Sequence, residues 1–409
     1  MKKFLSLIIL IILAVAGFSF YEKKHPADNG KKFAFWTIQL KPVYEKEINS
    51  IIKNFEKKHP DYKVVWVDIP IAEAQKRTLA SILSSTPPDL VNLNPDFSIL
   101  LAQKNALEYF SENETQSYLP SLVNRLKYQG KIYALPFYAT SSVTIYNKEI
   151  FDKCALDVPY TYDDLYKISP KIKTCANIPS FAININENDT LAKLLNKYNI
   201  NSIQTQNQIQ DSIHIYNMFN SMYKNNFLPK DVLTINHREV VEKYMSNQTS
   251  LIVAGSNFIN MIKQNALDTY NKSALSYQLK GSNNSYDVAL MNLIIPKKSK
   301  NKELAREFAF ELTSKENQLK LAHLTNVLPV NKEALEDDYF KNCPDDLVEK
   351  SRCISAKQLS NLNTVNFSQN NKKALNEAIN KTLEEILLNN SDVNKSVNNL
   401  SLELKRMQN

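Results

Sequence analysis

Short apolar runs alternate with amphipathic helical patterns over residues 30–109, and this alternation constrains the fold more than any other feature of the chain. The runs predict strands at Lys32–Thr37, Lys63–Asp68 and Leu90–Leu93. The helical spacing of apolar residues predicts helices over Lys41–His59 and Ala72–Ser84. Strands that alternate with helices form a mainly parallel sheet covered on both faces, so we expect an α/β fold. Ligands of such sheets bind beyond the carboxyl ends of the strands, which makes the loops after Trp36 and Leu93 candidate sites.

The rest of the chain is also mixed in pattern, and its 409 residues are enough for two domains or one large α/β unit. Further apolar runs predict strands at Lys131–Phe137, Ser142–Tyr146, Leu251–Ala254 and Val288–Ile295. The predicted helices include one opened by a capping box at Thr161–Asp164, then Lys302–Thr313, Lys315–Leu324 and two amphipathic helices within residues 375–404. Residues 176–250 are rich in Asn and mostly helical in pattern.

Composition excludes several classes of site. The chain has five glycines, and no two of them are close enough for a phosphate-binding loop or a dinucleotide fingerprint. Its five histidines are far apart, and the sequence contains no nucleophile elbow or paired-histidine zinc helix. The net charge of +8 is spread along the chain without a basic cluster, which disfavours nucleic acid as a partner. We therefore expect no catalytic residue, no metal ligand and no cofactor.

The N-terminal segment indicates export. Residues 1–20 combine a positively charged start with the apolar run Phe4–Phe20, and Ala14-Val15-Ala16 matches a signal-peptide cleavage site. We expect cleavage at or near Gly17. The run also approaches the length of about 17 residues that spans a membrane, so an uncleaved anchor is the alternative. No cysteine precedes Cys154, so a lipoprotein is not expected. With either outcome the bulk of the chain lies in the periplasm or otherwise outside the cytoplasm.

The four cysteines agree with an exported protein. An even number of cysteines in an oxidising compartment predicts two disulfides. The simplest pairing is local, with Cys154 bonded to Cys175 and Cys343 bonded to Cys353. Four cysteines allow three pairings, so the local one stays a prediction. Zinc is the rival explanation, and the absence of a C-x-x-C motif disfavours it.

Several motifs in a fixed order resemble those of a known family. Gly130–Phe137 reads G-K-I-Y-A-L-P-F, and Ile145–Phe151 reads I-Y-N-K-E-I-F. Further matches occur at Pro159–Leu165, Ser299–Phe308 and Leu328–Leu335. Together these motifs resemble the extracellular solute-binding proteins of ABC importers, in the group that includes maltose-, oligosaccharide- and glycerol-phosphate-binding proteins. The resemblance covers roughly residues 32–406.

This resemblance implies a two-lobed periplasmic-binding-protein fold of type II, with a ligand cleft at the hinge. Mapped onto this sequence, it places residues 31–139 and 292–331 in the first lobe and residues 141–287 and 334–409 in the second. The chain is expected to cross between the lobes near residues 138–142, 286–292 and 330–336. Both disulfides would then lie in the second lobe, which leaves the lobes free to close.

Sugar recognition combines aromatic faces with amides, hydroxyls and carboxylates, which gives the candidate ligand-binding residues. They are Trp36, Thr37 and Gln39 after the first strand, Asn94 and Asp96 after the third, Phe137 and Tyr138 at the first crossing, Asn257 and Phe258 after the strand Leu251–Ala254, and Met291 and Asn292 at the second crossing. Trp66 lies in the middle of a strand and is expected in the core. Replacing Trp36 or Tyr138 with Ala should therefore weaken binding, whereas replacing Trp66 should weaken the fold.

One motif departs from the family pattern. The family commonly has Gly-x-Trp after a short buried strand, and that Trp stacks on sugar. Here Gly255-Ser256-Asn257-Phe258 places Asn257 at the Trp position. Either Phe258 takes over the stacking role, or the ligand is less apolar than an oligosaccharide.

These observations predict an exported, monomeric substrate-binding protein that captures a sugar or polyol by lobe closure and passes it to the membrane subunits of an ABC importer. Two alternatives stay open. The first is a membrane-tethered interaction or scaffold protein that keeps this fold without uptake of a small ligand. The second is an exported hydrolase, which would need paired carboxylates or an activated nucleophile that the sequence does not display.

Overall fold

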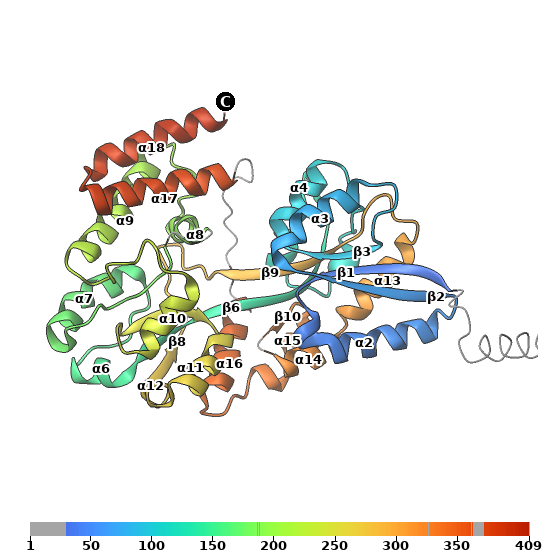
Figure 1. Cartoon of the computed structure of the whole chain (residues 1–409), viewed down its shortest axis with the longest axis horizontal. Coiled ribbons are helices and arrows are strands. Elements are labelled where there is room, and N and C mark those ends of the chain that lie inside the picture. Colours follow the sequence, from blue (N-terminus) through green and yellow to red (C-terminus); the bar gives the residue numbers. More distant parts are fainter. Residues whose placement is uncertain are drawn as a thin grey trace, which may run out of the picture.

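The computed structural model describes residues 30–185, 187, 189–325, 327–360, 362 and 372–408. The predicted signal or anchor segment, residues 1–20, lies outside the described residues. Two lobes are joined by long strands that run from one to the other (Figure 1). The two-lobed α/β class predicted from the sequence is confirmed.

The first lobe begins with the predicted alternation of strands and helices. Its elements up to the hinge are β1 (Lys31–Ile38), α2 (Lys41–Lys58), β2 (Tyr62–Ile69), α3 (Ile71–Leu83), β3 (Leu90–Leu93), α4 (Pro95–Gln103), η1 (Asn113–Thr115), α5 (Pro120–Asn124), β4 (Lys127–Tyr128) and β5 (Lys131–Ile132). Strand β1 pairs in parallel with both β2 and β3. Alternate residues of β1, Phe33 and Phe35, are fully buried because they face the helices that cover the sheet.

Strand β6 (Leu135–Asn147) carries the chain from the first lobe into the second. Residues Leu135–Ser141 pair with β9 (Val288–Ile294), and residues Ser142–Asn147 pair with β7 (Leu251–Gly255) and β8 (Ser273–Ser276). The sequence had predicted two separate strands here, whereas the structure has one strand of 13 residues. The pairs that β9 makes with β3 and β6 are antiparallel, so the sheet is mixed rather than mainly parallel.

The second lobe is largely helical. Its elements between the crossing strands are α6 (Lys148–Lys153), α7 (Tyr162–Ala176), α8 (Thr190–Asn196), α9 (Gln206–Lys224), α10 (His237–Met245), β7, α11 (Asn257–Asn265), α12 (Leu267–Lys272) and β8. The capping box predicted at Thr161–Asp164 opens α7. The C-terminal helices α17 (Lys372–Asn389) and α18 (Val393–Gln408) pack on α9 at the edge of this lobe (Figure 1).

The chain returns to the first lobe through β9 and then forms α13 (Lys302–Leu312), α14 (Lys315–Leu324), β10 (Leu328–Pro329), α15 (Lys332–Leu335) and η2 (Asp338–Phe340). Helix α16 (Leu347–Ser360) lies beneath the crossing strands and contacts β6, β8 and β10. Ser314 caps α14 as predicted, because its side chain accepts a hydrogen bond from the Asn317 N–H.

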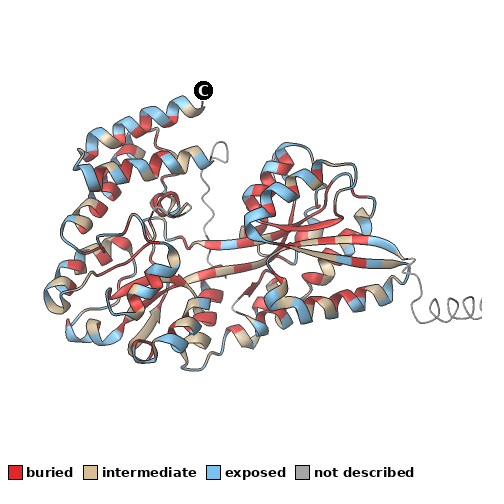
Figure 2. Cartoon of the chain, viewed as in Figure 1, coloured by how far each residue is buried: buried red, intermediate tan, exposed pale blue. Residues whose placement is uncertain are grey.

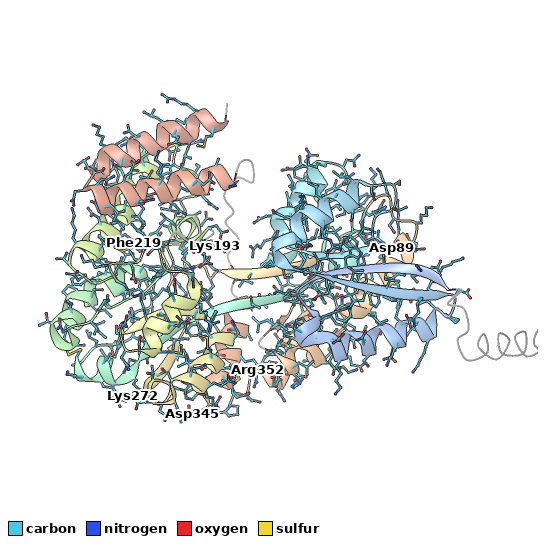
Figure 3. The ribbon with its side chains drawn as sticks, in the orientation of Figure 1. Asp89, Lys193, Phe219, Lys272, Asp345 and Arg352 are labelled. Atoms are coloured by element: carbon cyan, nitrogen blue, oxygen red, sulfur yellow. A yellow bond between two sulfur atoms is a disulfide. The ribbon has the colours of Figure 1, made fainter. Side chains whose placement is uncertain are left out.

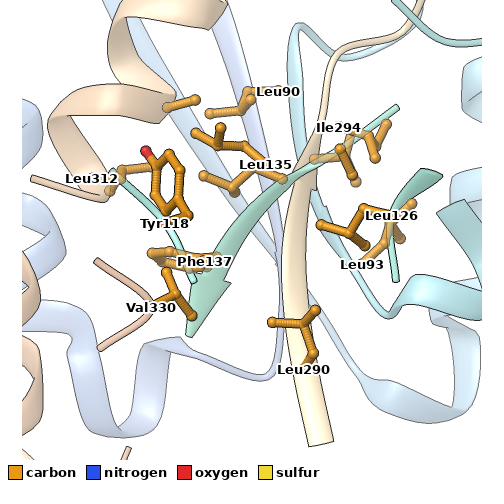
Figure 4. Close-up of a cluster of buried hydrophobic side chains, with 14 of the residues drawn as sticks. Leu90, Leu93, Tyr118, Leu126, Leu135, Phe137, Leu290, Ile294, Leu312 and Val330 are labelled. Carbon is orange, nitrogen blue, oxygen red and sulfur yellow. The ribbon is translucent and has the colours of Figure 1, made fainter. Parts of the chain in front are cut away.

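Separate hydrophobic cores define the two lobes, and buried residues alternate with exposed ones along every helix (Figure 2). The first-lobe core gathers side chains from β3, α5, β6, β9 and α13. The close-up around Phe137 and Leu290 shows its members from β3, β6, β9 and α13 (Figure 4). This core also includes Leu335, Phe340, Ala356 and Leu359, although the sequence-based boundaries had placed residues 334–409 in the second lobe. We therefore propose that the third connection follows Phe340 rather than Val330, because β10 and α15 both contribute to the first-lobe core.

Two disulfides join the predicted partners. Cys154 at the end of α6 is bonded to Cys175 in α7, within the second lobe. Cys343, after η2, is bonded to Cys353 in α16. On the boundary proposed above, the second bridge lies at the third connection between the lobes rather than inside the second lobe. Among the described residues, no helix is both long enough and apolar enough to cross a bilayer.

Candidate functional site

A cavity of about 470 Å³ lies where the two lobes and the crossing strands meet. Three parts of the chain form its lining. The first lobe contributes Val43, Tyr44, Thr325 and Val327, the crossing strands and the residue before β9 contribute Thr140, Ser141, Ser142, Asp287, Val288 and Ala289, and the second lobe contributes Lys193, Gly255, Ser256, Asn257 and Asn260. A ligand in this cavity would touch both lobes at once, which is the geometry that couples binding to lobe closure.

Tyr44 forms the aromatic part of the first-lobe wall. It lies on α2, and its hydroxyl is 3.0 Å from Thr325 Oγ1. The Tyr44 ring packs at 6.4 Å from the ring of Tyr138, which in turn packs against Phe137. Burial raises the pKa of Tyr44 above its ordinary value, and the hydrogen bond to Thr325 opposes that shift. Tyr44 therefore stays neutral at physiological pH and offers both a hydroxyl and a ring face.

The second-lobe wall is the turn from β7 into α11. Gly255 is the last residue of β7 and pairs with Ser142 of β6, so the start of α11 is held beside the first crossing. Ser256 and Asn257 follow at the helix start, and Asn260 lies one turn further on. Lys193 of α8 reaches the same cavity and forms a 2.7 Å ion pair with Asp189. This wall is rich in hydrogen-bond donors.

A polar network fixes the crossing strands beneath the cavity. The ammonium of Lys197 is buried and lies 3.1 Å from Asp287 Oδ2 and 2.7 Å from Gln278 Oε1. The Gln278 N–H donates to Gln358 of α16, whose amide in turn donates to Ser141 Oγ on β6. Asp287 is thus neutralised by Lys197, and both crossings are tied to the same cluster.

Three predicted site residues lie near the end of β1. Thr37 is fully buried, where it accepts a hydrogen bond from Trp66 Nε1 at 2.8 Å and donates one to Asp68. Trp36 is half-buried, and Gln39 is exposed with a left-handed φ of 54°. None of the three is in the cavity lining described above. Thr37 has a structural role that accounts for its hydrogen-bonding groups.

The residues predicted after β3 also have structural roles. Asn94 caps α4, because its side chain accepts a 2.9 Å hydrogen bond from the Phe97 N–H. Asp96 is exposed in the first turn of that helix. Asn292 is buried and donates to Ser98 Oγ. Asn92 is buried in β3, and its side chain donates a hydrogen bond to the Asn292 carbonyl of β9. This bond adds a side-chain link between β3 and β9.

The remaining predicted residues differ in their positions. Phe137 is buried in the first-lobe core, and Tyr138 and Met291 are half-buried. Phe258 packs against His237 with ring centroids 4.8 Å apart. All eleven predicted ligand-binding residues are among the described residues. Of these eleven, Asn257 alone lines the cavity.

Trp66 is only partly in the core, contrary to expectation. Its ring is half-buried and stacks on Phe35 at a centroid distance of 6.4 Å. The ammonium of Lys41 lies 5.2 Å from the Trp66 centroid. Trp66 lies on β2, which forms the edge of the sheet and leaves one side of the ring open.

Tyr44, Thr325, Lys193 and Asp287 line the cavity but were not singled out in the sequence. Tyr44 belongs to the apolar residues at helical spacing in α2, so the pattern predicts only that it packs in the core. Lys193 lies in the Asn-rich region that the sequence did not divide into helices. In the described chain, no three His, Cys, Asp or Glu side chains are grouped so that they could hold a metal ion.

Comparison with known proteins supports one family. The model of the bacterial extracellular solute-binding proteins matches residues 50–346. A multiple sugar-binding protein of Streptococcus mutans is 31% identical over 148 residues, covering 35% of this chain and 34% of that protein. An arabinooligosaccharide-binding protein of Bacillus subtilis is 23% identical over 206 residues, which cover 48% of this chain and 47% of that protein.

A solved structure shares the fold over almost its full length. It is a protein of Synechococcus sp. MITs9220, provisionally named an oligosaccharide periplasmic-binding protein. The two chains superpose with a TM-score of 0.82 at 23% identity, covering 91% of this chain and 98% of the other. Because the family model matches well over half of the sequence, the chain belongs to the bacterial extracellular solute-binding proteins.

Proposed function

We propose that this protein captures a small hydroxylated solute, a sugar or a polyol, in the cavity between its lobes and delivers it to the membrane subunits of an ABC importer. The observation that carries the proposal is the composition of the cavity lining. First lobe, second lobe and crossing strands all contribute side chains to one space. A volume of about 470 Å³ is within the range of small-molecule sites.

The mechanism needs differential binding and no chemical step. A ligand that touches both lobes binds the closed form better than the open form, so it shifts the population toward closure. The strands β6 and β9 form the axis of this motion, because they are the segments that belong to both lobes. Closure then presents a new combined surface of the two lobes to the importer.

The chemistry of the walls supports a hydroxylated ligand. Tyr44 offers an aromatic face to the apolar side of a sugar ring or carbon chain. Thr140, Ser256 and Asn260 offer hydroxyl and amide groups to ligand hydroxyls. The names of the relatives in Streptococcus mutans and Bacillus subtilis, which are sugar- and arabinooligosaccharide-binding proteins, support the same ligand class.

Family membership places the protein outside the cytoplasm. We propose further that it is released by signal cleavage near Gly17 rather than anchored, that no lipid is attached, and that it works as a monomer without nucleic acid. The uncleaved anchor is the alternative. Intact-mass measurement on protein from native membranes would show a chain beginning near Gly17; retention of Met1 would establish the anchor.

A thermal-shift screen against sugars and polyols, followed by small-angle X-ray scattering with each hit, tests the proposed function. We expect at least one compound to raise the melting temperature and to reduce the radius of gyration. Chromatography of the bound compound after incubation should recover it unchanged, whereas a hydrolase would cleave it. A protein that neither gains stability nor compacts with any compound of these classes would instead favour the scaffold alternative.

A further inference from the structure

The start of helix α11 points an unusual set of hydrogen-bond donors into the cavity. α11 spans nine residues, and its N-cap residue, Ser256, makes no capping hydrogen bond. Among the described residues, the backbone N–H groups of Asn257 and Phe258 donate to no main-chain carbonyl. The first turn of a helix carries partial positive charge because its N–H groups have no partner within the helix.

Ser256 provides a second, independent sign of a ligand. Its exposed fraction is only 5%, yet its side chain has no hydrogen-bond partner among the described residues and lies in the cavity lining. The residue borders the cavity, so its hydroxyl is available to a ligand that enters there. The hydroxyl group can donate a hydrogen bond to a ligand oxygen.

Other residues near Ser256 also bring polar groups to the cavity. A Cβ on Gly255 would lie 2.6 Å from Asn257 Oδ1, so glycine leaves room for the Asn257 side chain. Lys193 brings an ammonium to the same cavity, and Figure 3 shows it on the side of the second lobe that faces the crossing strands. The one carboxylate in the lining, Asp287, is held by buried Lys197.

The second-lobe part of the cavity lining, as the described residues form it, contains no aromatic residue. Phe258 packs against His237 and is not part of the lining, so it does not replace the tryptophan of the family motif. The second-lobe wall therefore offers hydrogen-bond donors in place of a stacking surface, among them the Lys193 ammonium, which also pairs with Asp189. A ligand complementary to this wall carries a concentrated negative charge at that end.

We infer that the ligand is an acidic sugar or polyol derivative, whose carboxylate or phosphate oxygens are bound by Ser256 Oγ, the N–H groups of Asn257 and Phe258, and the Lys193 ammonium. The hydroxylated remainder extends across the crossing strands toward Tyr44. This inference rests on the proposed function and deepens it. The charge of the bound group gives the second lobe an interaction that an uncharged sugar lacks.

Calorimetric titration with matched pairs of probes tests the inference. The pairs are gluconate with glucitol, glucuronate with glucose, and glycerol 3-phosphate with glycerol, with inorganic phosphate as an isolated anion. We expect the charged member of at least one pair to bind at least tenfold more tightly than its neutral partner. The carboxylate and phosphate pairs distinguish the two sources of negative charge. Neutral probes that bind and compact the protein while every charged partner binds more weakly would overturn the inference and leave the proposed function intact. Failure of all probes in these pairs and in the earlier screen would overturn the proposed function itself.

Two variants locate the subsite. Ser256→Ala should weaken binding of the charged probe by a factor of about ten to a hundred, since it removes a hydrogen bond to a charged group. Lys193→Gln should weaken it by a factor of about three to ten, because this exposed lysine is screened by solvent. Both variants should weaken the charged probe by a larger factor than its neutral partner. Equal losses for charged and neutral probes would show that this wall does not recognise charge.

Lys272→Gln is the matched control. Lys272 pairs with Asp268 at the same i, i+4 spacing that joins Lys193 to Asp189, but it lies at the lower edge of the second lobe, away from the cavity (Figure 3). It should leave the affinity for the charged probe unchanged. A loss in Lys272→Gln comparable to that in Lys193→Gln would show a general charge effect and overturn the assignment of Lys193.

Discussion

At the scale of single residues, Thr37 shows how a polar side chain beside a predicted site can be wholly structural. Its hydroxyl joins the Trp66 indole to the Asp68 carboxylate. Asp68 also accepts hydrogen bonds from the N–H groups of Leu40 and Lys41, at 2.9 and 3.0 Å. The carboxylate therefore caps the start of α2 from a neighbouring strand, and Thr37 holds it in place.

Thr37→Val should reduce stability without reducing ligand affinity. The substitution leaves the Trp66 N–H unpaired and removes a partner of Asp68, which costs about 1–3 kcal/mol of unfolding free energy. Urea unfolding measures this cost, and calorimetry measures affinity. Thr78→Val is the matched control: Thr78 is fully buried but its hydroxyl has no partner, so this variant should be close to neutral or slightly stabilising. A large loss of affinity in Thr37→Val would return Thr37 to the binding site.

Tyr44→Ala should weaken ligand binding more than Trp36→Ala or Tyr138→Ala. Tyr44 lines the cavity, whereas Tyr138 only packs against the Tyr44 ring. Loss of one large apolar face should cost about 1–3 kcal/mol of binding free energy, or one to two decades in Kd. Tyr44→Phe keeps the ring and loses only the bond to Thr325, so its effect should be smaller. Calorimetry on the four variants decides: a larger loss in Trp36→Ala would place the ligand beyond the end of β1, as the sequence predicts.

At the scale of elements, helices with a local start signal could be predicted from the sequence, whereas the crossing strand could not. The predicted capping box at Thr161 and the Ser314 cap both open helices. Two more capping boxes, at Thr205 and Asn236, open α9 and α10 and could have divided the Asn-rich region. Strand β6 was split in the prediction because its continuity depends on partners far along the chain, β9 in one lobe and β7 in the other.

The cavity was the least predictable feature for the same reason. Its lining joins Tyr44, Lys193 and Thr325, which local patterns do not connect. Asn257 could be found because it stands in a recognisable motif. Asn94 and Thr37 carried the right chemistry in suitable loops, but each is used to cap or hold a helix start. A sequence shows which groups are available, whereas only the packed structure shows which are already bonded.

The buried lysine beneath the cavity should give the fold a distinct pH dependence. Burial lowers the pKa of Lys197 below its ordinary value, although Asp287 opposes the shift. Between the lowered pKa and 10.5, the folded state binds fewer protons than the unfolded state. The contribution of Lys197 to the unfolding free energy therefore rises with pH in that window. The unfolding free energy of wild type minus that of Lys197→Met should therefore rise as the pH approaches 10.5.

Urea unfolding from about pH 7 to about pH 10 checks this prediction. Lys148→Met is the control that should not change with pH in this range. Lys148 is exposed, and its hydrogen bond to Asp152 raises its pKa above 10.5, so its stabilising contribution is complete below 10.5 and declines only at higher pH. A difference between wild type and Lys197→Met that stays constant or falls with pH would contradict the prediction.

At the scale of the whole molecule, two lobes with separate cores are connected by segments that share one polar network. Gln358 donates to Ser141 Oγ and to the Ser142 carbonyl on β6, and Gln278 contacts the backbone of Asp287 just before β9. Helix α16 is therefore attached to both crossings. It also contributes Leu359 to the first-lobe core, while Ile354 packs against a second-lobe cluster.

The two disulfides should consequently differ in their effect on function. Each closes a short loop, of 21 and 10 residues, and the chain-entropy model gives about 3 kcal/mol of unfolding free energy for each. Removing either pair by double Cys→Ser substitution should lower stability by about 2–4 kcal/mol. Only the loss of Cys343–Cys353 frees the third connection between the lobes. This variant should lose more entropy on closing, and its Kd should rise roughly three- to tenfold. The Cys154/Cys175 variant should bind as tightly as wild type, because its bridge lies inside the second lobe. Urea unfolding, calorimetry and small-angle scattering on both double variants provide the measurement; equal affinities in the two would show that the third connection does not control closure.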